Sequence, residues 1–213
     1  MSQASSAAWA SASGAGGIIP ATRFDLDVPE IFEAPFRYAT FEECLPSSAA
    51  NAILDWFESS AAPWNRVETD FYEQHEFSCF DAAGEVAAVL TSDSMIGGLR
   101  DDLTRLLGDT LRPEATVVAH RLLPGHRIGI HNDHLIGGET HRFVVQLNRG
   151  LSDADGGLFM LFNSADPCDI HAIFRPVSLS GFAFEISPWS HHAISEMHSS
   201  VRYSIVYSFF RAS

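Results

Sequence analysis

The sequence contains no lysine, and arginine supplies all 13 of its basic side chains. With 27 acidic residues, the formal net charge is −14. A protein that binds the phosphate backbone of DNA or RNA needs a basic face, because phosphate contacts dominate that affinity. The charge balance therefore predicts that nucleic acid is not a partner.

Cysteine is scarce, and long apolar runs are lacking. Cys44, Cys79 and Cys168 are widely spaced and form no Cys-x-x-Cys pair. An odd, scattered set of cysteines is typical of reduced thiols, which predicts a cytoplasmic protein. No apolar run approaches the roughly 20 residues that cross a bilayer, so we expect no membrane partner. The N-terminal stretch lacks a basic segment followed by an apolar one, which argues against a secretion signal.

No internal repeat is visible, which argues against a solenoid or a propeller. The length of 213 residues suits one domain, and a hydrophobic fraction of 46% with 16 Phe can build its core. We expect residues 1–20 to form a flexible tail and residues 21–213 to form a single domain. The sequence indicates no oligomeric state.

Helical periodicity is confined to the first half of the chain. Apolar residues recur at helical spacing over residues 47–59 and again over 94–107, where Gly108 stands at a position that commonly ends a helix. We therefore expect two helices within residues 21–115, which form a lead-in of helices and strands to the rest of the domain.

Short β-type runs dominate from residue 116 onward. Turn signals such as Pro124-Gly125 and Gly137-Gly138 separate them, and no helical pattern lies between them. The expected strands cover residues 116–122, 142–148, 158–162, 170–174, 182–186 and 201–210. This pattern predicts a mainly β fold, namely an antiparallel sandwich or jelly roll over residues 116–213 with the two N-terminal helices packed beside it.

Nine of the ten His residues follow residue 116, and one of them opens the segment His131-Asn132-Asp133. Residues i and i+2 of a strand point to the same face, so His131 and Asp133 can approach one metal ion. Two imidazoles and a carboxylate suit Fe(II) that must also bind O₂ and a co-substrate, and they suit catalytic zinc as well. His191 and His192 are both candidates for the third ligand. The alternative is a polar strand end with a solvated aspartate.

Arg202 stands on the last expected strand, where it shares one face with Ser204 and Val206. A guanidinium in so apolar a strand is costly unless a carboxylate pairs with it. That carboxylate can belong to an incoming ligand or to an internal Asp or Glu, and the residues favour neither alternative.

The stretch from Val118 to Phe210 resembles the Fe(II)/2-oxoglutarate-dependent dioxygenases, specifically their prolyl-hydroxylase-like branch. Its matching pieces follow the order seen in that family. They are Gly125, His131-x-Asp133, Leu147-Asn148, Gly156-Gly157, Pro176 with the run 182–184, His192-Ala193-Ile194, and Arg202-Tyr203-Ser204. Residues 36–60 look like the usual N-terminal lead-in of the family, so the resemblance covers most of the chain beyond the tail.

The resemblance implies a double-stranded β-helix, or jelly roll, with Fe(II) held by His131, Asp133 and His192. His192 is preferred to His191 because the family pattern places an aliphatic residue two positions after the ligand. If the local backbone is extended, only one of the two imidazoles can face the metal. No catalytic residue beyond the metal ligands is expected.

The resemblance also assigns residues to the co-substrate. Arg202 would bind the distal carboxylate of 2-oxoglutarate, and Ser204 could assist from the same strand face. Gln146 stands where relatives often place a second polar partner for that carboxylate, although tyrosine is common there. Arg142 and His134 are candidates for the substrate side of the pocket.

The implied reaction consumes O₂ and 2-oxoglutarate, releases succinate and CO₂, and hydroxylates a C–H bond. Asp133 favours hydroxylation over halogenation, because halogenating relatives lack the carboxylate ligand. The expected substrate is a small molecule or a peptidyl amino-acid residue. Residues 1–116 hold 19 acidic and 6 basic side chains, so an electronegative pocket mouth would favour neutral or cationic substrates. A merely solubilising acidic surface explains the same charge.

Two other functions remain open from the sequence. One is a cupin-like or zinc jelly-roll enzyme that does not use 2-oxoglutarate, and the other is a non-catalytic binding or sensor protein. Arg202 argues against both, because neither requires a buried arginine opposite the metal. The aromatic residues Trp64, Phe71, Tyr72 and Phe77 are expected to pack in the core or to form a lid over the pocket.

Overall fold

The computed structural model describes residues 23–212, so the expected tail over residues 1–20 lies outside the described residues. Strands pair antiparallel throughout two sheets. The larger sheet has the order β1 (Glu30–Phe32), β2 (Tyr38–Phe41), β10 (Gly181–Glu185), β7 (His141–Gln146), β12 (Arg202–Arg211), β5 (Leu111–Leu122), β4 (Glu73–Ser78), β3 (Asn65–Glu68). The smaller sheet has the order β6 (Ile128–His131), β11 (His192–Ile194), β8 (Phe159–Phe162), β9 (Ile170–Phe174).

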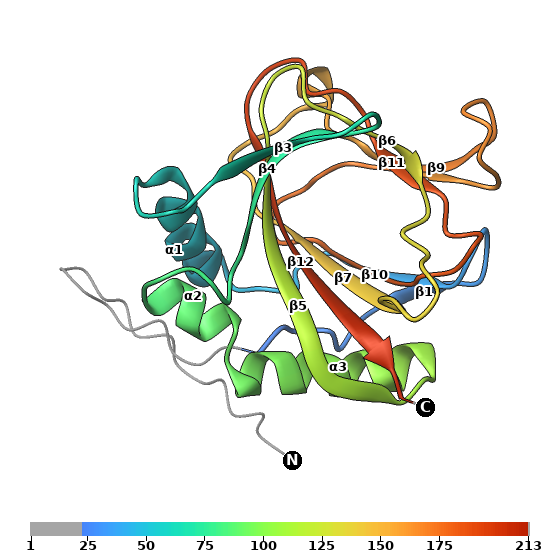
Figure 1. Ribbon diagram of the computed structural model, residues 1–213, viewed down its shortest axis with the longest axis horizontal. Coiled ribbons are helices and arrows are strands. Elements are labelled where there is room, and N and C mark those ends of the chain that lie inside the picture. Colours follow the sequence, from blue (N-terminus) through green and yellow to red (C-terminus); the bar gives the residue numbers. More distant parts are fainter. Residues whose placement is uncertain (1–22, 213) are drawn as a thin grey trace, which may run out of the picture.

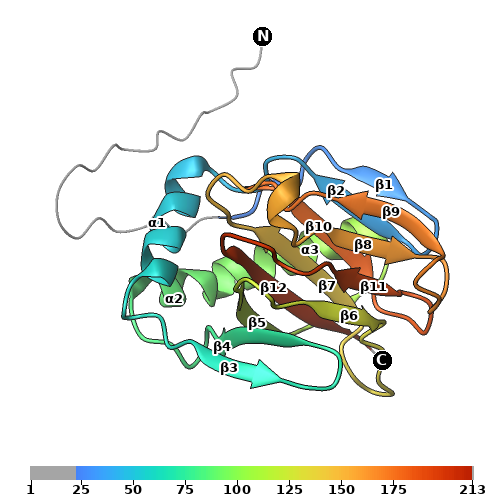
Figure 2. The ribbon, with the colours of Figure 1, turned by 90° about the horizontal axis from the view of Figure 1, so that it is seen from above.

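Three α-helices cover the outer face of the larger sheet, and the smaller sheet lies across its inner face (Figures 1 and 2). They are α1 (Ser47–Glu58), α2 (Glu85–Leu90) and α3 (Asp93–Leu107), and a short 3-10 helix, η1, spans Asp153–Asp155. Serine and glycine define the ends of α3, because the Ser92 side chain accepts a hydrogen bond from the Met95 N–H and Gly108 ends the helix with φ 85°.

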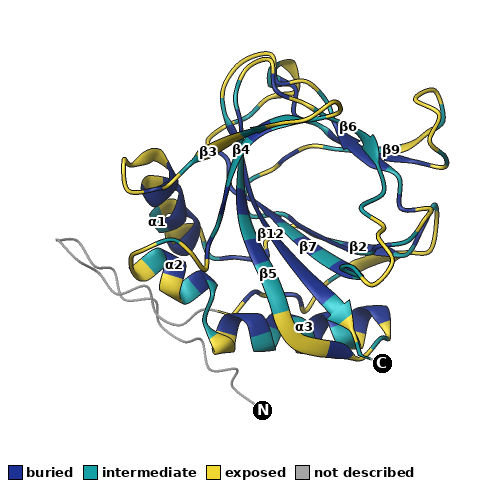
Figure 3. Ribbon diagram, in the orientation of Figure 1, coloured by how far each residue is buried: buried dark blue, intermediate teal, exposed yellow. Residues whose placement is uncertain are grey.

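Strand alternation on β12 directs its buried side chains to the two faces of the larger sheet. Tyr203, Ile205 and Tyr207 belong to the cluster that also contains the buried residues of the helices. Arg202 and Ser204 have the opposite parity and line a cavity between the sheets. The buried faces of the helices and of β12 are seen in Figure 3. Both faces of the larger sheet are therefore covered, and only the inner face carries polar groups of the site.

The sequence correctly predicted the mainly β class, the antiparallel pairing and the two long helices. All six expected strands are present, as β5, β7, β8, β9, β10 and β12. The short strands β1, β2, β3, β4, β6 and β11 and the helix α2 are not among the expected elements, although the strand character expected at His131 is found in β6. No helix among the described residues is long and apolar enough to span a membrane. The three cysteines are free thiols.

Candidate metal and co-substrate site

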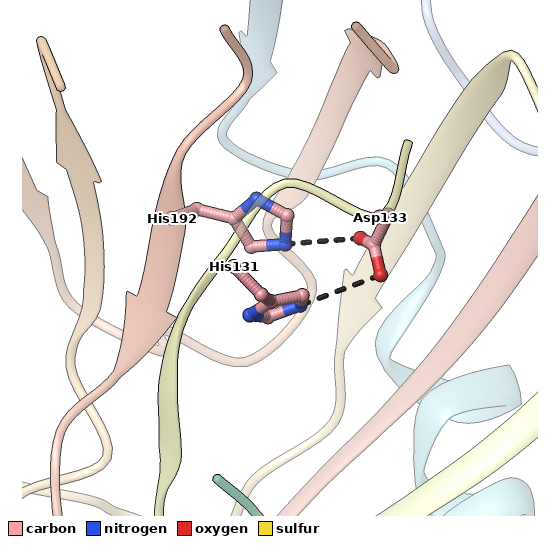
Figure 4. Close-up of side chains that lie close together, drawn as sticks. All are labelled: His131, Asp133 and His192. Carbon is pink, nitrogen blue, oxygen red and sulfur yellow. Dashed lines mark ion pairs between the residues drawn. The ribbon is translucent and has the colours of Figure 1, made fainter. Parts of the chain in front are cut away.

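His131, Asp133 and His192 come together at one end of the space between the sheets (Figure 4). β6 and β11 pair so that His131 lies opposite His192. The His131 Nε2 lies 3.4 Å from one Asp133 carboxylate oxygen, and the His192 Nε2 lies 3.2 Å from the other. One ligand atom from each residue lies within 4.8 Å of the others, so the three side chains could hold one metal ion.

Backbone carbonyls fix the orientation of both imidazoles. The His131 Nδ1 lies 2.9 Å from the Gly129 carbonyl oxygen, and the His192 Nδ1 lies 2.8 Å from the Ser190 carbonyl oxygen. A carbonyl can only accept, so each Nδ1 is the donor. Each Nε2 is then the atom available to a metal, which is the usual arrangement of metal-binding histidines.

The sequence did not indicate the backbone conformation that brings Asp133 to this position. β6 ends at His131, and Asp133 adopts a left-handed conformation with φ 59°. The expectation that strand alternation alone brings the two side chains together is therefore wrong. The Ser190 hydroxyl stabilises this turn, because it donates a hydrogen bond to the Asn132 carbonyl oxygen at 2.9 Å. Aspartate tolerates the left-handed region better than most residues.

The charge on Asp133 is strongly stabilised. Burial opposes its ionisation, but hydrogen bonds from His131 and His192 and the charge of Arg142 outweigh burial, and the pKa of Asp133 lies well below its usual value. Arg142 forms an ion pair with Asp133 and a second one with Glu139, at 2.7 Å. The carboxylate therefore remains ionised, as a metal ligand must be.

His191 takes no part in this cluster. His192 is buried and belongs to β11, whereas His191 precedes the strand and is only half-buried. Of the two adjacent imidazoles, only that of His192 approaches Asp133. The expected preference for His192 agrees with this geometry.

A cavity of about 280 Å³ extends from the three side chains into the space between the sheets. Arg202 lines it and is only 2% exposed. Among the described residues no Asp or Glu forms an ion pair with Arg202, and its Nε has no hydrogen-bond acceptor. Burial lowers the pKa of Arg202 to about 10. The internal carboxylate partner that the sequence left open is thus not found in the part of the chain that the structure describes.

Gly157 makes room for the side chains of Arg202 and Met197. A Cβ atom on Gly157 would lie 3.0 Å from the Arg202 Cδ and 2.4 Å from the Met197 sulfur. Gly157 also has φ 68°, which favours glycine. A side chain at position 157 would therefore displace the guanidinium.

Gln146 and Ser204 lie beside Arg202 on the inner face of the larger sheet. They are register partners on β7 and β12, both are buried, and both line the cavity. The Gln146 Oε1 has no hydrogen-bond partner among the described residues. An unsatisfied buried carbonyl beside an unpaired guanidinium is unusual, because nearly all buried polar atoms find partners.

The two residues expected on the substrate side differ in position. Arg142 lines the cavity close to Asp133, and its Nε donates to the Ser208 hydroxyl at 3.2 Å. His134 lies on the exposed loop after Asp133 and lines a second cavity that His131 and Asp133 also line. The structure therefore places Arg142 in the cavity between the sheets and His134 in a neighbouring cavity that shares two of the three clustered residues.

Three polar lining residues were missed by the sequence, namely Gln74, Glu76 and His120. His120 lies opposite Ser204 in the register, and burial, with the charges of Arg142 and Arg202, lowers the pKa of His120 to about 3. The alternation of the expected strand 116–122 places His120 on the face of Val118 and Leu122, which was the available signal.

The aromatic stretch that was expected to be core or lid divides between the two roles. Trp64 and Phe77 pack in the cluster under the helices. Phe71 and Tyr72 line the cavity instead.

Comparisons with known proteins confirm the fold. A prolyl-4-hydroxylase from Pseudomonas putida matches with a TM-score of 0.68 and 17% identity, over 83% of this chain and 93% of that one. A prolyl hydroxylase from Trichoplax adhaerens, solved with a peptide fragment of the hypoxia inducible factor oxygen degradation domain, matches with a TM-score of 0.65 and 15% identity, over 82% and 83%. A 2OG-Fe(II) oxygenase family protein from Burkholderia pseudomallei matches with a TM-score of 0.57 and 18% identity, over 83% and 86%.

No protein-family model matches the sequence, and no curated protein is significantly similar to it. At identities below 20%, the structural matches establish likeness of fold. The expected resemblance to the prolyl-hydroxylase-like branch is confirmed at that level.

Proposed function

We propose that this protein is an Fe(II)- and 2-oxoglutarate-dependent oxygenase that hydroxylates an unactivated C–H bond of a small molecule or of an amino-acid residue. The observation that carries the proposal is the buried, unpaired guanidinium of Arg202 in the same cavity as the His131, Asp133 and His192 cluster. Strands β5 to β12 alternate between the two sheets except at β8 and β9, which pair with each other in the smaller sheet, and this order supports the jelly-roll interpretation.

His131, Asp133 and His192 would hold the iron. The donor set fits, because two imidazoles with fixed Nδ1 hydrogen bonds and one ionised carboxylate leave coordination positions for other ligands. Bound iron and 2-oxoglutarate supply oxidation by O₂, in which one oxygen atom enters the product hydroxyl, the other enters succinate, and CO₂ is released.

Arg202 would bind the distal carboxylate of 2-oxoglutarate. Its guanidinium offers two parallel donors to a carboxylate, and the pair gains strength in a buried site. Ser204, the neighbouring hydroxyl on the same strand face, would donate to the same group. The Gln146 amide can turn its NH₂ toward that group as well, since its carbonyl has no partner to lose.

The remaining walls exclude water and position the metal ligands. Phe159, Phe182 and Phe184 line the cavity from β8 and β10 and keep it apolar next to His192. Arg142 holds the Asp133 carboxylate in place from β7. A dry cavity strengthens the pairing of Arg202 with a bound carboxylate.

The first alternative function leaves part of the site without a role. A zinc enzyme or a cupin-like oxygenase needs the metal ligands but gives no role to a buried, unpaired arginine. A sensor protein that binds 2-oxoglutarate without turnover would use the same residues, and only activity separates it from the proposed enzyme. Single-domain organisation over residues 21–213 and a cytoplasmic location remain part of this proposal, the latter supported by the three free thiols.

The test is reaction stoichiometry. Purified protein is incubated with Fe(II), 2-oxoglutarate and O₂, with and without candidate amino acids and short peptides, and succinate and CO₂ are measured. We expect succinate and CO₂ in equal amounts and a higher rate of their formation when a substrate is present. With zinc in place of iron, we expect neither product. Binding of 2-oxoglutarate without succinate formation in any mixture would favour the sensor function.

A further inference from the structure

The end of the cavity formed by β4 carries hydrogen-bond acceptors, whereas the end formed by Arg202 carries a positively charged donor. Gln74 and Glu76 project into the cavity from this strand, and Tyr72 lies just before it. β5 separates β4 from β12, and strands lie about 4.8 Å apart, so the backbones of β4 and β12 are roughly 10 Å apart. The cavity therefore joins two polar ends at different positions on one sheet.

Gln74 carries a buried acceptor, its side-chain carbonyl, that no donor of the described residues reaches. The Gln74 Nε2 donates to one oxygen of Glu76 at 2.6 Å, which fixes the amide orientation because a carboxylate cannot donate. The Gln74 Oε1 then has no hydrogen-bond partner among the described residues, although Gln74 is only 4% exposed. A buried acceptor without a donor is costly, and it indicates a donor that arrives with a ligand.

The negative charge of Glu76 is not compensated within the described residues. No Arg forms an ion pair with it, and the only ionisable partner within 4.0 Å is the His120 Nε2, at 3.9 Å. Burial lowers the pKa of His120 to about 3, so at neutral pH this imidazole is uncharged. Glu76 therefore faces the cavity as a carboxylate that no cation of the chain neutralises.

An aromatic ring completes this end. Tyr72 lines the cavity beside Glu76, and burial and the Glu76 charge both raise the pKa of the Tyr72 phenol. Phe71 also lines the cavity and packs against Tyr72. Aromatic faces next to a carboxylate favour cations, because the ring quadrupole and the charge attract the same partner.

We propose that the β4 end, made of Tyr72, Gln74 and Glu76, binds an ammonium or guanidinium group of the substrate, such as the basic group of an arginine or lysine, free or within a peptide. This inference rests on the proposed function and specifies its substrate class. Such a group supplies several donors and a positive charge to acceptors that the fold leaves unpaired. The reaction is unchanged: a C–H bond of the cationic substrate becomes C–OH as O₂ and 2-oxoglutarate are consumed and succinate and CO₂ are released.

The experiment compares substrates with a cationic side chain with neutral partners of similar shape. L-Arginine is paired with L-citrulline and L-lysine with L-norleucine, each as the free amino acid and as the N-acetyl amide, and L-glutamate is the anionic control. Anaerobic protein with Fe(II) and 2-oxoglutarate is first checked for the weak visible band of the iron chelate, and succinate release is then measured in air. At least one cationic compound is expected to exceed its neutral partner by about tenfold or more in kcat/KM.

Variants test whether the β4 end causes the preference for a cationic substrate. Glu76→Gln is expected to reduce the advantage of the cationic compound to within about twofold, mainly through KM, and Gln74→Leu is expected to reduce it less. Glu68→Gln is the matched control, because Glu68 lies in the same hairpin but is exposed, pairs with Arg66 and does not line the cavity. If Glu76→Gln fails to fold, Gln74→Leu carries the comparison.

The outcomes separate this inference from the proposed function. No visible band in the wild type overturns both. With the band present, equal use of neutral and cationic partners, preference for glutamate, or no response to any compound overturns the inference alone. Equal losses in Glu68→Gln and Glu76→Gln also overturn it, since the effect would then belong to the general acidic field.

Discussion

The two ends of the cavity that would hold the metal and 2-oxoglutarate differ in how completely the fold satisfies them. At the metal end, the Nδ1 atoms of His131 and His192 donate to backbone carbonyls and Asp133 pairs with Arg142, which leaves each Nε2 free for a metal. At the other end, the Arg202 Nε and the Gln146 Oε1 are buried without partners among the described residues. The chain itself orients the metal ligands at the first end, whereas the second end is incomplete without a ligand. Unsatisfied atoms therefore mark where the polar groups of a ligand belong.

The largest effect is expected at the metal end. Replacing Asp133 or His192 with Ala removes one of three ligands, and iron affinity should fall by about 100-fold or more, since even residues that only orient ligands cost 10–100-fold. Metal content after dialysis and calorimetric titration with Fe(II) measure it. His191→Ala is the matched control and should retain iron. Loss of iron in His191→Ala but not in His192→Ala would shift the assignment by one residue.

At the incomplete end, Arg202→Met should separate stability from binding. The variant removes a charge-assisted pair with the co-substrate, so 2-oxoglutarate binding should weaken by roughly 2–4 kcal/mol while iron binding persists. Without 2-oxoglutarate, the variant should be as stable as the wild type or more so, because an unpaired buried charge is lost. Thermal unfolding with and without 2-oxoglutarate tests both the expected loss of binding and the expected stability. A large destabilisation without ligand would show that Arg202 has a structural partner after all.

His120 lies between Ser204 and Glu76 in the strand register, and its burial predicts a pH dependence. Its pKa is about 3 in the folded protein and near 6.5 when unfolded, so the unfolded chain binds the proton first. Stability should therefore fall as the pH drops from 6.5 toward 3, by up to about 1.4 kcal/mol per pH unit from this group. Denaturant unfolding of wild type and His120→Asn, which cannot titrate, isolates the effect. Parallel stability curves for the two proteins over this range would contradict the burial of a neutral His120.

The smallest effect is expected from Gln146→Leu. It replaces a single amide hydrogen bond to the co-substrate, so 2-oxoglutarate affinity should fall by about 1 kcal/mol, severalfold. The metal-free protein should lose no stability, because the Gln146 carbonyl has no partner there. Titration of 2-oxoglutarate against the wild type checks the first statement. An effect as large as that of Arg202→Met would make Gln146 the principal partner of the carboxylate.

Sequence patterns predicted the part of the fold in which strands bury an apolar face. β5, β7, β8, β10 and β12 contain buried apolar residues and lie between turn signals, whereas β9 is mostly exposed and was predicted from its β-type residues between turns. β1 and β3 are mostly exposed, and β11 has only three residues, so none of them carries a hydrophobic period. These strands are specified by their neighbours rather than by their own composition.

The candidate site likewise contains residues that local sequence patterns identify and residues that only tertiary contacts place there. His131, His192 and Arg202 could be identified from local motifs, and the structure places them around one cavity. The turn at Asp133 could not, because its left-handed conformation depends on contacts with the segment that carries Ser190. Gln74 and Glu76 were missed because residues 73–76 are polar throughout, which indicates a solvated segment, and only the tertiary fold turns these two side chains inward.

The most direct test of the account is anaerobic visible spectroscopy of the protein with Fe(II) during addition of 2-oxoglutarate. We expect a weak charge-transfer band that saturates in the wild type, requires a much higher 2-oxoglutarate concentration in Arg202→Met, and is missing in Asp133→Ala. These outcomes would place metal and co-substrate at the two ends of one cavity. A wild-type protein without the band, or the same midpoint in wild type and Arg202→Met, would contradict the account.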